Sequence, residues 1–91
     1  MSVEIIIPAP LRKHVNNKKR LTCEATSVKE VFDFLKEESH VLVDHLLEET
    51  GELREFIKVF VNKKDIGKQG GMSTTVSAKD VVSIVPAFAG G

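Results

Sequence analysis

The chain has 91 residues, 42% hydrophobic and 29% charged, which predicts one small folded domain rather than a disordered segment, a coiled coil or two domains. Thirteen Lys and Arg balance thirteen Asp and Glu, so general electrostatic attraction to nucleic acid or to an anionic membrane is excluded. One cysteine and three histidines exclude an intramolecular disulfide framework and a closed zinc or iron–sulfur site, and a reducing cytoplasm is the expected location. The sequence has no basic start with a long apolar run, so neither secretion nor membrane insertion is expected.

The first third of the chain predicts two strands joined by a basic loop. Residues 3–7 are apolar and β-branched, which predicts a strand buried on both faces and closed by prolines. Residues 12–20 contain five bases and no acid, and Asn16 and Asn17 supply turn chemistry, so this segment is expected to be a hairpin loop with a basic tip. Residues 21–26 alternate as in a half-exposed second strand, with Cys23 facing inward.

Two helical patterns occupy the middle of the chain. Ser27 and Glu30 form a capping box, which predicts a helix start with each residue bonding the other's amide. The first apolar stripe consists of Val28, Val31, Phe32 and Leu35. A second pattern covers residues 42–47 and is expected to end near Gly51. Residues 29–55 carry nine acids against three bases, so this helical half is acidic.

The last third predicts strands separated by turns. Residues 56–61 form a strand candidate, residues 62–65 a turn, and Ile66 the start of a short return strand. The glycines of residues 67–71 lack phosphate-loop spacing and are interpreted as a loop. A turn at residues 77–80 leads into a last strand that Pro86 ends. The expected organisation is a domain of residues 1–86 followed by a flexible tail of residues 87–91.

This order of elements indicates the α+β class. It predicts a mixed sheet of four to five strands covered by helix on one side, with the most apolar strands, the first and the last, together at its centre. A β-grasp (ubiquitin-like) roll fits this order.

Several segments resemble one family of proteins. They are residues 61–66, 70–72 and 78–82, and the final run Ile84-Val85-Pro86-Ala87-Phe88-Ala89-Gly90-Gly91. The pattern is similar to the ubiquitin-like sulfur carriers, which include the molybdopterin synthase small subunit and the thiamin sulfur carrier, and above all to the sulfur carrier of bacterial cysteine biosynthesis. Phe88 departs from the small aliphatic residue frequent in relatives, and residues 27–55 exceed the helical region of thiamin carriers.

The resemblance implies a protein co-substrate rather than an enzyme. The Gly91 carboxylate would be adenylated with ATP by a ubiquitin-activating-type adenylyltransferase and sulfurtransferase. The resulting thiocarboxylate would supply a sulfur-accepting enzyme that makes cysteine or a related amino acid. No cofactor would be bound by the chain itself. The residues entering the partner's channel would be Pro86, Ala87, Phe88, Ala89 and Gly90, where Gly and Ala keep the segment slim and Phe88 fills an apolar pocket.

Two phenylalanines are candidates for partner docking. Phe56 and Phe60 share a parity in their strand that differs from the parity of the aliphatic residues between them. Lys58 has the same parity as the phenylalanines, which favours an outward orientation for this set.

The remaining candidates have simpler interpretations. Cys23 is expected to be packed and inert, because its strand position is inward and no basic residue neighbours it. His40 and Asp44 are spaced i, i+4 on a helix, but without a third ligand they are interpreted as a solvated face. The basic loop has no aromatic residue to stack bases, so RNA binding is not expected.

Three alternative functions stay open at this point. The chain could be the small subunit of molybdopterin synthase. It could instead be a protein modifier joined through Gly91 to lysines, or a non-covalent β-grasp binding module.

Overall fold

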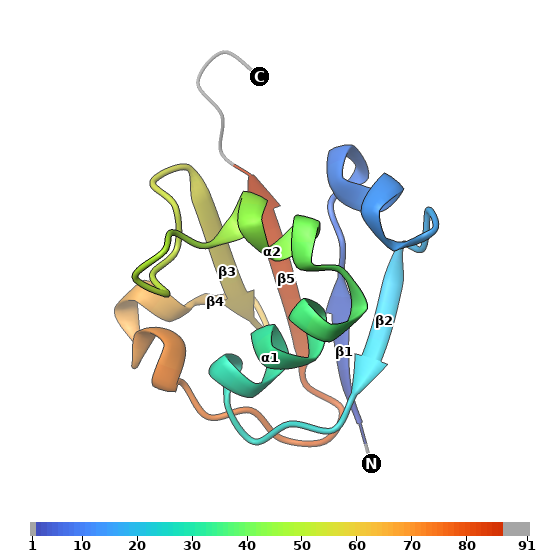
Figure 1. Cartoon of the computed structure of the whole chain (residues 1–91). Helices are drawn as coiled ribbons and strands as arrows, with labels where there is room; N and C mark the ends of the chain where they lie inside the picture. Colours follow the sequence, from blue (N-terminus) through green and yellow to red (C-terminus); the bar gives the residue numbers. More distant parts are fainter. Residues whose placement is uncertain (1, 87–91) are drawn as a thin grey trace.

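The computed structural model describes residues 2–86 of the chain. Within these residues, no helix has the length and apolar character needed to cross a membrane. Figure 1 shows the element order, in which η denotes a 3-10 helix: β1 (Val3–Ile6), η1 (Ala9–Val15), β2 (Arg20–Cys23), α1 (Val28–Glu38), α2 (His40–Leu46), β3 (Ile57–Val61), β4 (Lys64–Asp65), η2 (Ile66–Lys68), η3 (Gly71–Ser73) and β5 (Val81–Pro86).

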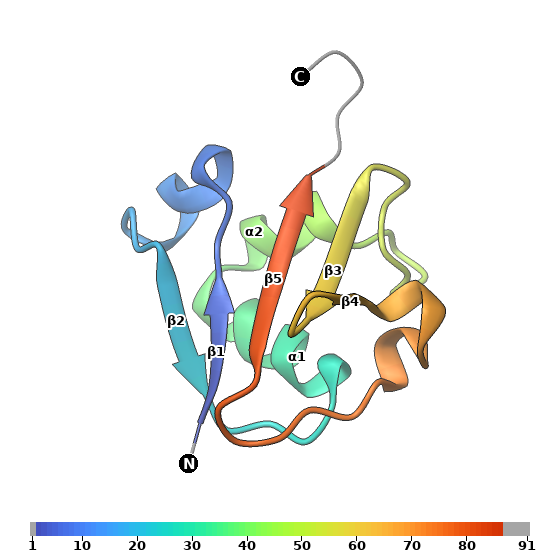
Figure 2. The same cartoon turned by 180° about the vertical axis from the view of Figure 1, so that it is seen from behind.

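The five strands form one mixed sheet in the order β2-β1-β5-β3-β4. β5 runs parallel to β1 and antiparallel to β3, while β2 and β4 are added antiparallel at the two edges. The predicted central pairing of the first and last strands is therefore confirmed. Both α-helices lie on one side of the sheet, and the other side is open (Figures 1 and 2). This is the predicted α+β, β-grasp arrangement.

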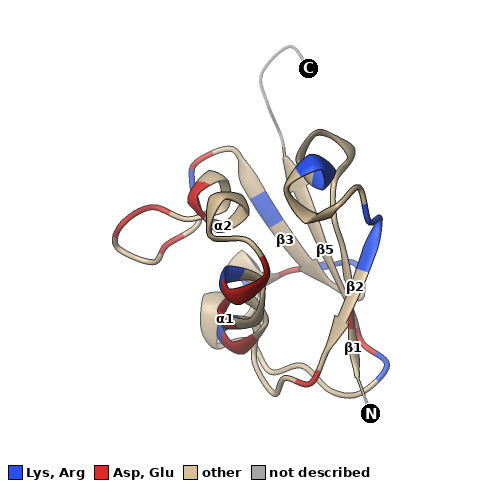
Figure 3. Cartoon of the chain, turned by 45° about the vertical axis from the view of Figure 1, so that its right-hand side comes forward, with Lys and Arg blue, Asp and Glu red and all other residues tan. Residues whose placement is uncertain are grey.

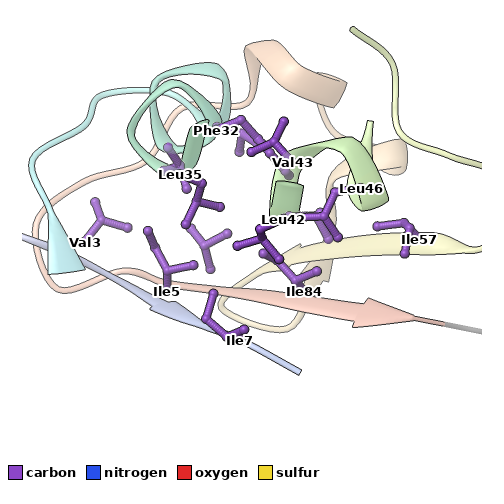
Figure 4. Packing of buried hydrophobic residues seen from close by; sticks show 14 of the residues in the cluster. Val3, Ile5, Ile7, Phe32, Leu35, Leu42, Val43, Leu46, Ile57 and Ile84 are labelled. Atoms are coloured by element: carbon purple, nitrogen blue, oxygen red, sulfur yellow. The ribbon is translucent and has the colours of Figure 1, made fainter. Parts of the chain in front are cut away.

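The hydrophobic core fills the space between the sheet and the helices (Figure 4). The predicted stripe of α1 is buried in full, and Leu35 has no exposed surface. Burial of one such leucine contributes about 1.5–3 kcal/mol. The main contributors, by element, are Val3, Ile5 and Ile7; Val28, Val31, Phe32 and Leu35; Leu42, Val43 and Leu46; Ile57, Val59 and Val61; and Val82 and Ile84.

The first strand corrects one expectation. Val3 and Ile5 are buried, whereas Glu4 and Ile6 are only half-buried, so the strand is not buried on both faces. Helices cover only one side of the sheet, and an apolar residue such as Ile6 is left on the other. An apolar run therefore predicted the strand correctly but not its environment.

The basic segment after β1 is also different from the prediction. Instead of a plain hairpin loop, it begins with η1, whose residues Leu11 and Val15 are buried in the core. Asn16 and Asn17 make the predicted turn, with φ of 55° and 61°, and lead into β2. The prolines at the start of η1 fit a helix's first turn, where no amide partner is needed.

The start of α1 is half as predicted. The Ser27 hydroxyl accepts a hydrogen bond from the Glu30 amide at 3.3 Å. The Glu30 carboxylate, however, accepts from the amide of Thr26 at 2.7 Å rather than from that of Ser27. The reciprocal bond is displaced by one residue, because Thr26 offers the carboxylate its hydroxyl, at 3.0 Å, as well as its amide.

The second helix ends earlier than expected. Ser39 caps its start by accepting from the Leu42 amide at 3.2 Å, and Leu47 already has extended backbone angles. The chain turns back so that Leu47 pairs with Leu53 in an isolated bridge. Gly51, expected as the helix cap, lies in this turn with a φ of 90°.

The β3–β4 turn is tighter than the sequence suggested. Asn62 and Lys63 both have positive φ, 51° and 75°, and β4 starts at Lys64 rather than at Ile66. The Asn62 side chain accepts from the Val81 amide at 2.9 Å and donates to Asp80 at 2.8 Å. The turn is thereby fixed to the predicted turn at residues 77–80, which precedes β5.

Lys63 provides a test of this turn. Two positive φ values characterise the type I′ hairpin turn, for which Asn-Gly is the preferred pair. Lys63→Gly is expected to raise the free energy of unfolding by about 0.5–1 kcal/mol, because the left-handed conformation costs a side-chain-bearing residue more than it costs glycine. Urea denaturation measures the change.

The neighbouring substitution is the matched control. Lys64 lies in β4 and pairs with Val61, so Lys64→Gly is expected to lower stability. Equal effects of the two glycines would contradict the assigned turn geometry.

Candidate functional site

The predicted reacting segment begins where the central strand ends. Pro86 is the last residue of β5 and pairs with Ile57 of β3. The predicted tail residues Ala87, Phe88, Ala89, Gly90 and Gly91 lie outside the described residues. Their roles stay predictions, and what the structure supplies is their point of attachment.

The strand that leads to this point is paired on both sides. The β5 backbone is paired with β1 from Val81 to Ser83 and with β3 from Val82 to Pro86. Because β1 and β5 are parallel, η1 follows β1 at the same end of the sheet (Figure 1). α2 and the segment leading into β3 also reach this end. A chain leaving Pro86 therefore starts from one of the most constrained strands of the fold.

The open face of the sheet has an apolar centre. Ile57, Val59 and Val61 are buried against the helices, which places Phe60 and Lys58 on the opposite face. Phe56 precedes the strand and is 46% exposed. The phenylalanine set therefore lies outward, while its role in docking stays a prediction.

Sequence reasoning missed two apolar members of this face. Val85 is 40% exposed and lies opposite Lys58, and Ile6 is half-buried opposite Ser83. The sequence signal that could have identified them is Ser83, a single polar residue inside an otherwise apolar strand. Its position indicates which alternate residues of β5 lie on the open face. The apolar runs of β1 and β5 concealed this alternation.

An ion pair lies on each side of this apolar centre. Arg20 of β2 contacts Glu4 of β1 at 2.8 Å, and Lys58 of β3 lies 3.8 Å from Asp65 of β4. Exposed pairs of this kind contribute little to stability. An apolar centre within a charged margin is instead the usual composition of a surface that binds another protein.

Charge is distributed unevenly around the fold. Figure 3 shows Lys and Arg on η1 and β2, whereas α1, α2 and the loop after α2 carry mainly Asp and Glu. The predicted acidity of the helical half is thus seen in space. A groove of about 590 Å³ on this layer is lined by both signs of charge, so it does not select an anion or a cation.

Cys23 has the surroundings of an unreactive thiol. The side chain is half-buried against the core. Burial raises the pKa of the Cys23 thiol, and the nearby Glu30 carboxylate raises this pKa further. Because the thiolate is the nucleophile, both effects suppress reactivity at neutral pH.

The histidines form no metal site within residues 2–86, where no group of three or more His, Cys, Asp or Glu side chains could hold an ion. His40 contacts Asp44 at 3.3 Å on an exposed helix face, as expected from their spacing. His14 of η1 stacks on His45 of α2, with ring centroids 5.0 Å apart. The sequence carried no signal for this contact, which joins two distant segments.

Comparisons with known proteins agree with this geometry. The ThiS family matches residues 5–91. The sulfur carrier protein CysO of Mycobacterium tuberculosis is 30% identical over 93 residues, covering 100% of both chains. A putative sulfur carrier protein of Archaeoglobus fulgidus is 30% identical over 91 residues, again covering 100% of both.

Solved structures give the same result. A chain in the crystal structure of the Amycolatopsis orientalis BexX/CysO complex has a TM-score of 0.91 and 32% identity, with coverage of 98% of this chain and 99% of that one. The crystal structure of Mycobacterium tuberculosis CysO has a TM-score of 0.87 and 27% identity, with coverage of 94% and 99%. The chain belongs to the ThiS family of ubiquitin-like sulfur carriers and resembles its CysO members.

Proposed function

We propose that the chain carries sulfur as a thiocarboxylate on Gly91 and donates it in the biosynthesis of cysteine or a related amino acid. The observation that carries this proposal is the match to CysO proteins over the whole of both chains, together with a family match that extends to residue 91. The resemblance to the cysteine-type carrier in residues 84–91 supports the same assignment.

The chemistry requires activation by a partner. A free carboxylate has only oxide to expel, so sulfur cannot replace its oxygen directly. In the proposed sequence, a Gly91 carboxylate oxygen attacks the α-phosphorus of ATP and releases pyrophosphate. Sulfide (HS⁻) then attacks the acyl carbon of the adenylate, AMP leaves, and loss of the remaining S–H proton gives the thiocarboxylate. A ubiquitin-activating-type adenylyltransferase supplies both steps.

The chain's own contribution is presentation. β5 anchors the reacting segment by hydrogen bonds to two neighbouring strands. Ordering five further residues in a partner's channel costs conformational entropy, so the folded domain must provide the affinity. The open face beside β5, with Phe56, Phe60 and Val85, has the composition for this role. The Amycolatopsis CysO crystallised together with BexX supports a partner-docking role for this fold.

Other parts of the proposal concern the partners and the location of the chain. Because catalysis is assigned to the partners, ATP binds to the activating enzyme and the chain acts as co-substrate. Location in the cytoplasm stays a prediction. The structural likeness to the small archaeal modifier protein 1 of Haloferax volcanii, at 20% identity, concerns the fold alone and does not favour the modifier alternative.

Intact mass measurement tests the reacting residue. After incubation with ATP, a sulfide source and the host's activating enzyme, the full chain is expected to gain the mass of one oxygen-to-sulfur exchange in its C-terminal peptide. A variant lacking Gly91 is expected to gain nothing, because the required carboxylate is then misplaced.

Lys68→Ala, in the exposed η2 region, serves as the control and should gain the same mass as the full chain. An unchanged mass with an active enzyme present would reject the carrier proposal. Conjugates joined through Gly91 to lysines would instead support the modifier alternative.

A second prediction concerns the open face. Phe56→Ser is expected to lower kcat/KM for thiocarboxylate formation about tenfold through a higher KM, because it removes an apolar docking contact and no reacting group. Val41 of α2 is the matched control, since it is an apolar residue of similar exposure, 52% against 46%, on the helical side. Val41→Ser should change KM less than twofold, and equal effects of the two variants would argue against docking through the open face.

A further inference from the structure

The β2 edge of the sheet is open. β2 is the terminal strand in the order β2-β1-β5-β3-β4, and no described segment lies beyond it (Figures 1 and 2). The Ile7 amide donates a hydrogen bond to the Lys19 carbonyl at 2.9 Å. In an antiparallel ladder every second pair is hydrogen-bonded, so the backbone groups of Leu21 and Cys23, like those of Lys19, point toward β1. By the same alternation, the backbone groups of Arg20 and Thr22 point away from β1.

The exposed side chains along β2 are complementary to the same side chains of a second copy that runs antiparallel. Arg20, Thr22 and Glu24 are all exposed and have one parity. If a second copy is placed antiparallel with Thr22 opposite Thr22, Arg20, which also contacts Glu4 of its own chain at 2.8 Å, lies opposite Glu24 of the other copy, and this occurs twice by symmetry. Opposite charges and Thr–Thr are both favourable cross-strand pairs.

The same register also gives favourable contacts on the helical side of the sheet. Leu21 then lies opposite Cys23 of the second copy, so two half-buried apolar residues cover each other on the helical side. The outward backbone groups of the two Thr22 residues meet in two hydrogen bonds, and those of Arg20 face Glu24, the residue after β2, where up to about four more can form. A shift by one residue would lose the backbone bonds and both charge pairs together.

From these observations we propose that the β2 edge binds a second copy of this chain, forming an antiparallel β2–β2 pair centred on Thr22 and a continuous ten-stranded sheet. The interface is isologous, because each copy uses the same edge. Its small area places it in the weak, transient class of protein contacts. Lys18 and Lys19, which would protect an edge from pairing, lie outside the central residues of the register.

This dimer goes beyond sulfur carriage and is compatible with it. A two-fold axis through the β2 pair makes the two β5 strands antiparallel, so their Pro86 ends point in opposite directions. The open faces of the two copies lie side by side in the extended sheet, and Phe56 and Phe60, near the far edge, are not covered.

Charge reversal tests the register. Glu24→Arg and Arg20→Glu, each alone, place like charges opposite each other twice and should weaken self-association about tenfold, as measured by sedimentation velocity up to roughly 1 mM protein. An equimolar mixture of the two variants restores both opposite-charge pairs, so it should associate within about threefold of the natural chain. Glu38→Arg, at an exposed site on α1, makes the same change in net charge as Glu24→Arg and should have little effect.

A proline variant tests the backbone contact. The Thr22 amide faces away from β1, so Thr22→Pro, present in both copies, removes two hydrogen bonds from the proposed dimer and none from the folded chain. We expect a folded monomer by circular dichroism and sedimentation. In the natural chain, the Thr22 amide should show a concentration-dependent chemical shift.

Three results would overturn the proposal. They are a natural chain that remains monomeric to roughly 1 mM, a mixture of the charge variants that fails to associate, and an association lost in Phe56→Ser but kept in Thr22→Pro. The last result would assign self-association to the open face. None of these measurements depends on Gly91, so they leave the carrier proposal to its own test.

Discussion

The pairing of β5 with both β1 and β3 is the constraint on which the rest of the molecule depends. The last strand lies between the first strand and the third, so the sheet is incomplete until the end of the chain has been inserted. The core side chains Val82 and Ile84 come from this strand and contact neither solvent nor the open face. Such non-local pairing is slow to form, and it couples the integrity of the whole domain to the strand from which the proposed reacting segment continues.

The helices cover only one side, and this asymmetry creates the candidate docking surface. Each central strand contributes alternate residues to the core and to the open face, so Ile84 packs under α2 while Val85 is left exposed. The apolar residues on the open face gain nothing from the fold's own core. A surface of this composition is retained at a cost in solubility, which is consistent with use by partner proteins.

The sequence predicted the elements whose signals are local. The stripe of α1, the Ser27 cap and the turn at residues 77–80 depend on contacts within a few residues, and each was confirmed. The class and central strands also followed, because apolar content distinguishes buried strands from edge strands. The strand period correctly predicted that Phe60 lies outward, and Phe56, in the turn before β3, is exposed as well.

The errors arose where distant segments decide the outcome. η1 forms because Leu11 and Val15 reach the core beneath it, which no local pattern of the basic segment indicated. α2 stops at Leu46 because Leu47 pairs with Leu53, although its helical periodicity continues. The Glu30 carboxylate bonds Thr26 rather than Ser27 because Thr26 offers two donors, its amide and its hydroxyl, and the hydroxyl lies 3.0 Å from the carboxylate. In each case two alternative contacts compete, and the spacing of residues in the sequence does not show which contact is more stable.

The two edges of the sheet differ in a way that bears on both proposals. β4 has only two residues, and the chain turns at once into η2, so this edge offers little backbone to a partner. β2 is twice as long, and the exposed row of Arg20, Thr22 and Glu24 has a base at one end and an acid at the other. β5 lies between these edges and is separated from β2 by β1. The β2 edge and the open face beside β5 are therefore different surfaces, so self-association and partner binding need not compete.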